Sequence, residues 1–308
     1  MRILFMGTPD FALFSLRALV EAGEDVVGVV TQPDKPKGRG YTLTPPPVKV
    51  YAEEKGLPVY QPRTLRDEEF ADLLQQIDPE VIVVVAFGKI LPANVLSYPK
   101  YGCVNVHGSL LPAYRGAAPM QRAIIDGCAE TGITTMFMDV GLDTGDMLLK
   151  KSVAIDLYDT FETVHDKLGE CGAELLLRTL ALLEKGEITP EKQDDALATY
   201  AAKIEKEDCL LDFSRTAKEV HDRIRGLSPI PLSFTHTPDG RLLKIVASEP
   251  TEGKGRPGEV ISLENGRITV ACGEGAIALL SVLPEGKKKM SSADFINGRR
   301  ISVGDILN

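Results

Sequence analysis

The sequence predicts an α/β domain with a mostly parallel sheet, followed by a small β-barrel domain. In the first two thirds of the chain, nearly continuous runs of β-branched residues alternate with stretches of helical periodicity. This alternation is typical of a parallel sheet that helices cover on both faces. After residue 205 the pattern changes to short strands separated by turn signals, which is typical of a small antiparallel barrel or sandwich.

Apolar runs predict the strands of the first domain, at residues 3–6, 26–30, 81–87 and 133–138. Helical spacing predicts helices at residues 11–23, 48–55, 67–76, 119–125 and 163–183. We expect Asp10 to cap the first helix. Pro119 suits the first turn of another helix, because the N–H that proline lacks has no partner there. This domain is predicted to span residues 1–188.

The rest of the chain is predicted to be a linker and a second domain. Residues 189–207 are polar with little periodicity, as expected of a linker. Residues 208–308 are predicted to hold one helix at 216–227 and strands at 232–237, 242–248, 260–263, 268–272 and 277–283. Asp–Gly and Asn–Gly turns separate several of these strands. Their spacing predicts an OB-like β-barrel.

Composition places the chain among ordinary soluble globular proteins. Of 308 residues, 44% are hydrophobic and 26% are charged. No apolar run approaches the roughly 20 residues that span a bilayer, and the first residues lack a signal-peptide pattern. The five cysteines are scattered and form no C-x-x-C, which argues against a disulfide framework or a zinc site. We therefore expect a cytoplasmic protein without a metal.

The net charge of −9 argues against a protein coated in positive charge, but the charge is unevenly distributed. Residues 1–205 carry 20 basic and 30 acidic side chains, and residues 206–308 carry 15 and 14. One segment, residues 33–50, is basic and also holds five prolines and two glycines. Its basic residues are Lys35, Lys37, Arg39 and Lys49. It is a poor helix or central strand, so it is either a flexible surface loop or a mobile basic loop that meets an anion.

The first strand runs through Gly7 into a helix, as in a Rossmann-like dinucleotide site. That fingerprint needs three glycines, which allow the backbone to approach a pyrophosphate. Here Pro9 removes a backbone donor, Asp10 places negative charge where the phosphate would sit, and Phe11 adds bulk. The domain is therefore predicted to be Rossmann-like without a nucleotide cofactor at this turn.

The most informative segment is GCVNVHGSLLP, residues 102–112. Residues two apart in a strand point to the same face, so Asn105 and His107 share a face just before the strand ends. Open α/β sheets bind ligands at this edge. A core histidine bonded to the backbone is the alternative. Residues 138–146 end another predicted strand, and Asp143 is the acid there that could face an imidazole.

Asn, His and Asp together suit acyl transfer without a covalent intermediate. An amide NH2 group and an imidazolium can both donate hydrogen bonds to an oxyanion, while a carboxylate orients the imidazole. Ser109 and Cys103 lack the setting that activates a nucleophile. Asp139 and Asp146 are further candidate acids, although an acidic turn is often only a cap or a solvated loop.

At these positions the sequence resembles the 10-formyltetrahydrofolate-dependent formyltransferases. Asn105, His107 and Asp143 match the family's Asn–His–Asp site. The match extends along essentially the whole chain, through GTPDF (7–11), TQPD (31–34), GRG (38–40), SLLP (109–112), YRGAAP (114–119), GLDTGDM (141–147) and GKKKM (286–290). The resemblance implies that 10-formyltetrahydrofolate is the formyl donor. The basic loop and the C-terminal barrel indicate the branch whose acceptor is the α-amino group of initiator methionyl-tRNA.

The resemblance also implies roles for individual residues. Asn105 and protonated His107 would stabilise the oxyanion, and Asp143 would orient His107 and assist proton movement. Two strand ends would form the folate slot: Val85, Ala86, Phe87 and Gly88, and Ser109, Leu110, Leu111 and Pro112. Basic residues would contact the tRNA: Lys35, Lys37, Arg39, Lys49, Lys287, Lys288 and Lys289. Arg39, between two glycines, would be the loop's main contact.

Three other functions stay open. The same site could formylate an amino sugar nucleotide, or hydrolyse formyltetrahydrofolate. The chain could also be a non-catalytic RNA-binding protein, although the intact Asn–His–Asp set argues against it. Nothing in the sequence, such as a heptad or a long apolar edge, demands a second copy, so we expect a monomer.

Overall fold

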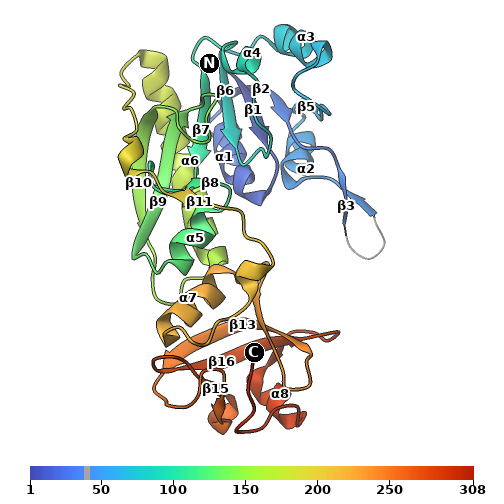
Figure 1. Ribbon diagram of the computed structural model, residues 1–308. Helices are drawn as coiled ribbons and strands as arrows, with labels where there is room; N and C mark the ends of the chain where they lie inside the picture. Colours follow the sequence, from blue (N-terminus) through green and yellow to red (C-terminus); the bar gives the residue numbers. More distant parts are fainter. Residues whose placement is uncertain (38–41) are drawn as a thin grey trace. The chain divides into compact units, whose positions relative to one another are not determined.

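A computed structural model describes residues 1–37 and 42–308 (Figure 1). Contacts between Cα atoms divide the chain into two compact units. Unit 1 comprises Met1–Gly116, Thr131–Val153 and His165–Tyr200, and unit 2 comprises Ala117–Glu130, Ala154–Val164 and Ala201–Asn308. Residues 117–130 and 154–164 thus group by contact with the C-terminal residues. The domain borders expected at residues 188 and 208 stay a prediction.

Unit 1 is built on a seven-stranded sheet with the order β10-β9-β7-β6-β1-β2-β5. The strands are β1 (Arg2–Gly7), β2 (Asp25–Val30), β5 (Val59–Tyr60), β6 (Val81–Val85), β7 (Cys103–His107), β9 (Glu130–Phe137) and β10 (Met147–Ala154). The pairs β1–β2, β1–β6, β2–β5 and β6–β7 are parallel, and β7–β9 is antiparallel. Every residue of β6 is buried, as its unbroken apolar sequence predicts. The predicted mostly parallel α/β fold is confirmed.

Helices pack on both faces of this sheet. The helices of unit 1 are α1 (Asp10–Glu21), α2 (Pro47–Glu54), α3 (Glu68–Ile77), α4 (Ala93–Leu96) and most of α6 (Phe161–Lys185), whereas α5 (Pro119–Ile125) groups with unit 2. One apolar cluster joins Phe70 of α3 and Val95 of α4 to Cys103 of β7. On the opposite face, Gly172 of α6 lies against Val106, whose Cγ1 is 3.0 Å from where a Cβ on Gly172 would stand. Cys103 and Val106 therefore mark the two faces of β7.

The predicted N-cap of α1 is wrong, whereas α3 begins at an aspartate that does cap it. Asp10 does not cap α1, because the N-cap residue is Pro9, which forms no side-chain cap. The Asp10 carboxylate instead accepts from the backbone N–H of Phe11 and lies beside His165. In α3, by contrast, Asp67 is the N-cap and accepts a hydrogen bond from the backbone N–H of Phe70.

The basic segment is a hairpin followed by a helix. Strands β3 (Lys35–Lys37) and β4 (Thr42–Thr44) pair antiparallel, with Lys35 opposite Thr44. Helix α2 then begins at Pro47, a residue that suits the first turn. In its described residues the segment forms two short hairpin strands outside the seven-stranded sheet, and its end is helical, in line with the helix predicted at 48–55. Arg39 lies outside the described residues.

Unit 2 contains a curled antiparallel sheet with the order β12-β13-β16-β15-β14, with β17 also paired to β16. Its strands are β12 (Ser233–His236), β13 (Leu242–Thr251), β14 (Val260–Ser262), β15 (Ile268–Ala271), β16 (Ala276–Pro284) and β17 (Met290–Ser291). The helices beside it are α7 (Ala217–Gly226) and α8 (Ser292–Asn297). Val220 and Ile224 of α7 share one apolar core with Ile245, Leu279 and their neighbours. The expected small barrel is confirmed as this half-barrel sheet.

The segment between the two predicted domains is short and irregular. It contains the two-residue strand β11 (Tyr200–Ala201), which pairs with β8 (Arg115–Gly116). The 3-10 turns are η1 (Asp195–Leu197), η2 (Glu207–Cys209) and, in the barrel, η3 (Glu264–Gly266). Among the helices in the described ranges, none is both long and apolar enough to cross a membrane.

Candidate active site

Strand β7 places Asn105 and His107 on one face at its carboxyl end. Asn105 pairs with Met136 of β9 and His107 with Thr134, without a register shift between them. Their side chains therefore point to the same side. Asn105 is partly exposed, whereas His107 is only 6% exposed. The predicted shared face is present at the edge where parallel α/β sheets bind ligands.

The two ring nitrogens of His107 have different partners. Nε2 lies 3.0 Å from the backbone oxygen of Tyr114. A carbonyl oxygen only accepts, so this nitrogen carries a proton and donates. Nδ1 lies 3.7 Å from Oδ2 of Asp143, within ion-pair distance but longer than a hydrogen bond. The structure therefore brings His107 and Asp143 together, and also bonds the histidine to the backbone, as the alternative expected.

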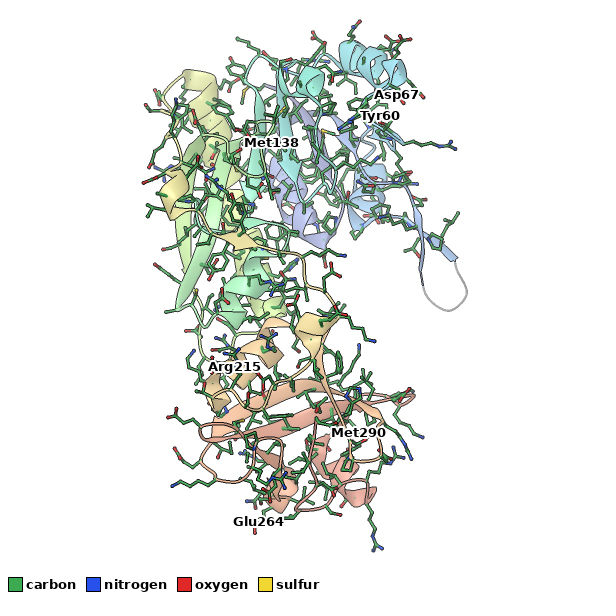
Figure 2. All side chains as sticks on the ribbon, viewed as in Figure 1. Tyr60, Asp67, Met138, Arg215, Glu264 and Met290 are labelled. Carbon is green, nitrogen blue, oxygen red and sulfur yellow. The ribbon has the colours of Figure 1, made fainter. Side chains whose placement is uncertain are left out.

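The turn after β9 directs Asp143 toward His107, while Asp139 forms hydrogen bonds within the turn itself. Met138, labelled in Figure 2, precedes this turn, and its backbone N–H donates to the Cys103 oxygen. Oδ1 of Asp139 accepts from the Gly141 N–H at 2.9 Å and from the Thr144 hydroxyl at 2.7 Å. Asp143 has a left-handed backbone (φ 53°), and its Oδ2 accepts from the Gly116 N–H at 2.8 Å. Of the candidate acids, Asp143 is the one that faces the imidazole.

Sequence reasoning missed one residue that contacts this turn and a second residue that holds the first. The Gln193 amide donates to the backbone oxygens of Asp143 and Gly145, and Arg115 donates to Gln193. Gln193 lies in the segment predicted to be a linker, and no local pattern links it to a residue 50 positions earlier. The arginine of the YRGAAP motif, Arg115, was the one available signal.

The first expected wall of the folate slot, Val85–Gly88, is the last residue of β6 and the turn that follows it. Val85 and Phe87 are buried, while Ala86 and Gly88 are exposed and have left-handed backbones. The Phe87 oxygen accepts from the Thr8 hydroxyl at 3.2 Å and from Gln32 Nε2 at 3.1 Å. These contacts hold the segment while leaving the backbone at Ala86 and Gly88 accessible.

The second expected wall leaves β7, the parallel neighbour of β6. The Leu111–Pro112 peptide is cis. The buried Thr134 hydroxyl donates to the Ser109 oxygen at 2.7 Å and accepts from the Leu111 N–H at 3.0 Å. Leu110 and Pro112 are partly exposed. Since β6 and β7 end at the same edge, both walls lie beside His107, and their combination of apolar side chains and accessible backbone fits a flat heterocycle.

The basic residues of the hairpin differ in their availability. Lys35 is exposed, and its charge, after the larger effect of burial, lowers the pKa of Lys89. Lys49 is different, because its ammonium donates to both oxygens of Asp34 and to Gln61. Hydrogen bonds from Gln61 and then Lys49 hold the pKa of Asp34 below its usual value. Lys49 therefore anchors the base of the hairpin, and the side chain of Lys37 lies outside the description.

In unit 2 the basic residues also divide into two groups. Those on α7 and just before it are paired: Arg215 (labelled in Figure 2) with Asp212, Lys218 and Arg225 with Asp222, and Arg223 with the Asp208 oxygen. Lys287, Lys288 and Lys289 are instead exposed in the turn between β16 and β17. Lys287 also lines a cleft of about 450 Å³ with Arg241, Arg299 and Arg300, beside Asp239, Glu285 and Asp305. The second group remains available to an anionic partner.

Comparison with known proteins identifies the class to which this fold and site belong. The formyl transferase model matches residues 1–180, and the model of the formyl transferase C-terminal domain matches residues 203–300. The chain belongs to the formyl transferase family. It is therefore a formyl-transferring enzyme, as the resemblance implied.

Two relatives that match along the whole chain carry the same name. The methionyl-tRNA formyltransferase of Citrifermentans bemidjiense is 51% identical over 307 residues, covering 100% of this chain and 96% of that protein. The methionyl-tRNA formyltransferase of Caldanaerobacter subterraneus is 50% identical over 310 residues and is matched over its full length.

Solved structures with a similar fold are more distant in sequence. HypX from Aquifex aeolicus in complex with tetrahydrofolic acid has a TM-score of 0.66 at 18% identity, over 98% of this chain and 48% of that one. An N-formyltransferase from Helicobacter canadensis, solved with folinic acid and dTDP-3-aminofucose, has a TM-score of 0.66 at 19% identity, over 91% and 98%. At these identities the likeness shows the fold alone.

Proposed function

We propose that this enzyme transfers the formyl group of 10-formyltetrahydrofolate to the α-amino group of methionine carried by initiator tRNA. The observation that carries the proposal is the full-length match, at about half identity, to methionyl-tRNA formyltransferases. The pairing of His107 with Asp143 at the end of β7 supports it from the site. Family membership supports a folate donor, which brings a formyl carbon bonded to a leaving nitrogen.

The proposed reaction is a direct acyl transfer. The amine attacks the formyl carbon, and Asn105 and His107 donate hydrogen bonds to the oxyanion that forms. In the structure the Nε2–H of His107 donates to the Tyr114 oxygen, and a substrate oxygen in the site would share the same donor. The bond to the folate nitrogen then breaks, and the proton lost by the amine moves to that nitrogen with help from Asp143.

Asp143 acts on His107 in two ways: its negative charge lies beside the ring, and its carboxylate fixes the orientation of the ring. Nδ1 of His107 lies 3.7 Å from Oδ2 of Asp143, so the carboxylate can orient the ring and stabilise positive charge that develops on it during the transfer. Because the Gly116 N–H also binds Oδ2, the carboxylate keeps one orientation. The buried surroundings of His107 strengthen both interactions relative to water.

The folate would lie between the Val85–Gly88 and Ser109–Pro112 segments, where backbone groups can bind the pterin. The tRNA would contact Lys35, Lys37 and Arg39 of the hairpin and Lys287, Lys288 and Lys289 of the β16–β17 turn. We leave Lys49 out of these contacts, since its donors are bound to Asp34 and Gln61. The monomeric state and the cytoplasmic location stay predictions.

One assay tests the proposal against the alternatives. Tetrahydrofolate release is measured with 10-formyltetrahydrofolate alone, with initiator methionyl-tRNA added, and with an amino sugar nucleotide added instead. We expect rapid release with the tRNA alone of the three, together with formation of N-formylmethionyl-tRNA. Rapid release without any acceptor indicates a hydrolase, rapid release with the sugar indicates a sugar formyltransferase, and no release indicates a non-catalytic protein.

A further inference from the structure

The backbone around Asp143 is held by one side-chain amide. Nε2 of Gln193 donates to the Asp143 oxygen at 2.7 Å and to the Gly145 oxygen at 2.8 Å. An amide NH2 group has two hydrogens, so both are used. Asp143 has a left-handed backbone (φ 53°), which costs a non-glycine residue on the order of 1 kcal/mol. Such a conformation persists when the surrounding structure imposes it. Here Gln193 can impose it, because it binds the carbonyl oxygens of both Asp143 and Gly145.

The contact between Gln193 and the turn arises from strand-like pairing. Glu191 and Met147 exchange backbone hydrogen bonds at 2.8 Å in an antiparallel bridge. In this antiparallel register, Gln193, two residues after Glu191, therefore lies opposite Gly145, two residues before Met147. The segment that leads away from α6 is thus fixed beside the start of β10, and its side chain reaches the turn.

Arg115 fixes which end of the Gln193 amide faces the turn. The guanidinium, 2% exposed, donates from Nε to Oε1 of Gln193 at 3.0 Å. Arginine has donors only, so the amide oxygen must face it and the NH2 group must face the turn. Nη2 of Arg115 donates to Asp195 at 2.8 Å, but Asp195 is 83% exposed, so that outer contact adds little.

Residues 114–116 connect every part of this arrangement. The Tyr114 oxygen accepts from His107, the Arg115 side chain orients Gln193, and the Gly116 N–H binds the Asp143 carboxylate. Three consecutive residues therefore position His107, Gln193 and the carboxylate of Asp143 relative to one another.

We propose that Gln193 is a positioning residue for the transfer reaction. Its amide holds residues 143–145 so that the Asp143 carboxylate faces His107, and Arg115 keeps the amide in the active orientation. This inference rests on the proposed function, since it gives Gln193 a role through Asp143.

Gln193→Glu tests the proposal because it keeps the size and the oxygen that faces Arg115. It replaces the donor NH2 group by an oxygen that confronts two carbonyl oxygens. We expect kcat for formyl transfer to fall about 10²-fold, the loss typical of a catalytic group misplaced by about 1 Å. KM for the folate should stay unchanged, since the folate walls are not touched. Gln193→Met, which has a similar length and no donor, should behave alike.

Two controls separate positioning from a general structural effect. Asp195→Asn removes the outer partner of Arg115 while leaving both Gln193 donors, and should keep kcat near wild type. In the Asp143→Asn background, adding Gln193→Glu should change kcat by less than about threefold, because residues that act through one another are not additive. Titration with tetrahydrofolate counts folded sites, so kcat is expressed per competent molecule.

The outcomes distinguish a failure of the Gln193 positioning role from a failure of the proposed formyl-transfer function. If the wild-type enzyme forms no N-formylmethionyl-tRNA, the proposed function fails. If the wild type is active and both Gln193 variants keep its kcat per folded site, the positioning role is wrong. A full loss added on top of Asp143→Asn also overturns it, because Gln193 then acts elsewhere.

Discussion

The carboxylate of Asp143 faces His107 because Asp143 itself adopts a left-handed backbone conformation. Aspartate is several-fold enriched among the non-glycine residues found at positive φ, and here φ is 53°. The neighbouring glycines fit the same turn: a Cβ on Gly145 would stand 1.9 Å from the Phe137 oxygen. The sequence GLDTGD therefore encodes a compact turn that directs one carboxylate toward the strand next to it.

At this scale we predict the effect of removing each catalytic side chain. Asn105→Ala and His107→Ala should each lower kcat by about 10²- to 10³-fold, the usual loss of an oxyanion donor. Asp143→Ala should also lower kcat strongly, because His107 loses its orienting charge. Steady-state kinetics with saturating folate and tRNA measure these losses. Asp146→Asn, on the same turn, is the matched control and should keep most of the activity. Near-wild-type kcat in any of the three variants removes that residue from the mechanism.

Between elements, α1 and α6 are joined by a titrating contact. His165 of α6 has Nε2 3.6 Å from Oδ1 of Asp10 in α1 and Nδ1 2.9 Å from Oδ1 of Asp166. Its ring also packs against Phe11 and Phe14. Asp10, and to a lesser extent Asp166, raise the pKa of His165 despite the opposing effect of burial, and His165 lowers the pKa of Asp10.

These shifts predict how stability depends on pH. A raised histidine pKa gives stability that is fully present below the unfolded value of about 6.5 and is lost as pH rises through the folded value. A lowered aspartate pKa gives stability that is present above about 3.9 and is lost as pH falls through the folded value. The pair should therefore stabilise the protein most between about pH 4 and 6.5. Tm measured from pH 5 to 8 should fall less in His165→Asn than in wild type. An equal fall in both proteins would assign the pH dependence to other groups.

Elements with strong local patterns were predictable, and those set by distant contacts were not. Helix α5 runs from Pro119 to Ile125 as predicted, because proline at its start and the apolar spacing agree. Strand β10 was missed, since it lies at the edge of the sheet and its exposed lysines hide the strand pattern. Likewise the face of β7 followed from a period of two, whereas Gln193 reaches Asp143 across 50 residues of chain.

Over the whole molecule, the net charge of −9 coexists with local positive charge. Burial, and then the positive charge of the exposed Lys35, lower the pKa of Lys89. In unit 2, Lys287, Lys288 and Lys289 are exposed together, while Lys218 and Arg225 are both paired with Asp222. Summed charge is therefore a poor guide to the partner of this chain, because pairing within the fold decides which cations remain available.

This distribution predicts how tRNA binding depends on salt. Each phosphate contact releases counterions, so affinity should fall linearly on a log–log plot against salt, and each lost contact should flatten the slope by about 1. We expect Lys35→Ala, and separately Lys288→Ala, to weaken tRNA binding and flatten the slope, with folate affinity unchanged. Lys151→Ala is the matched control, because Lys151 is a surface lysine already paired with Glu174. Binding measured by filter retention between 50 and 200 mM salt, a range in which such contacts change affinity strongly, decides the outcome. If Lys151→Ala flattens the slope as much as Lys35→Ala, binding follows total charge and the two proposed contact regions are wrong.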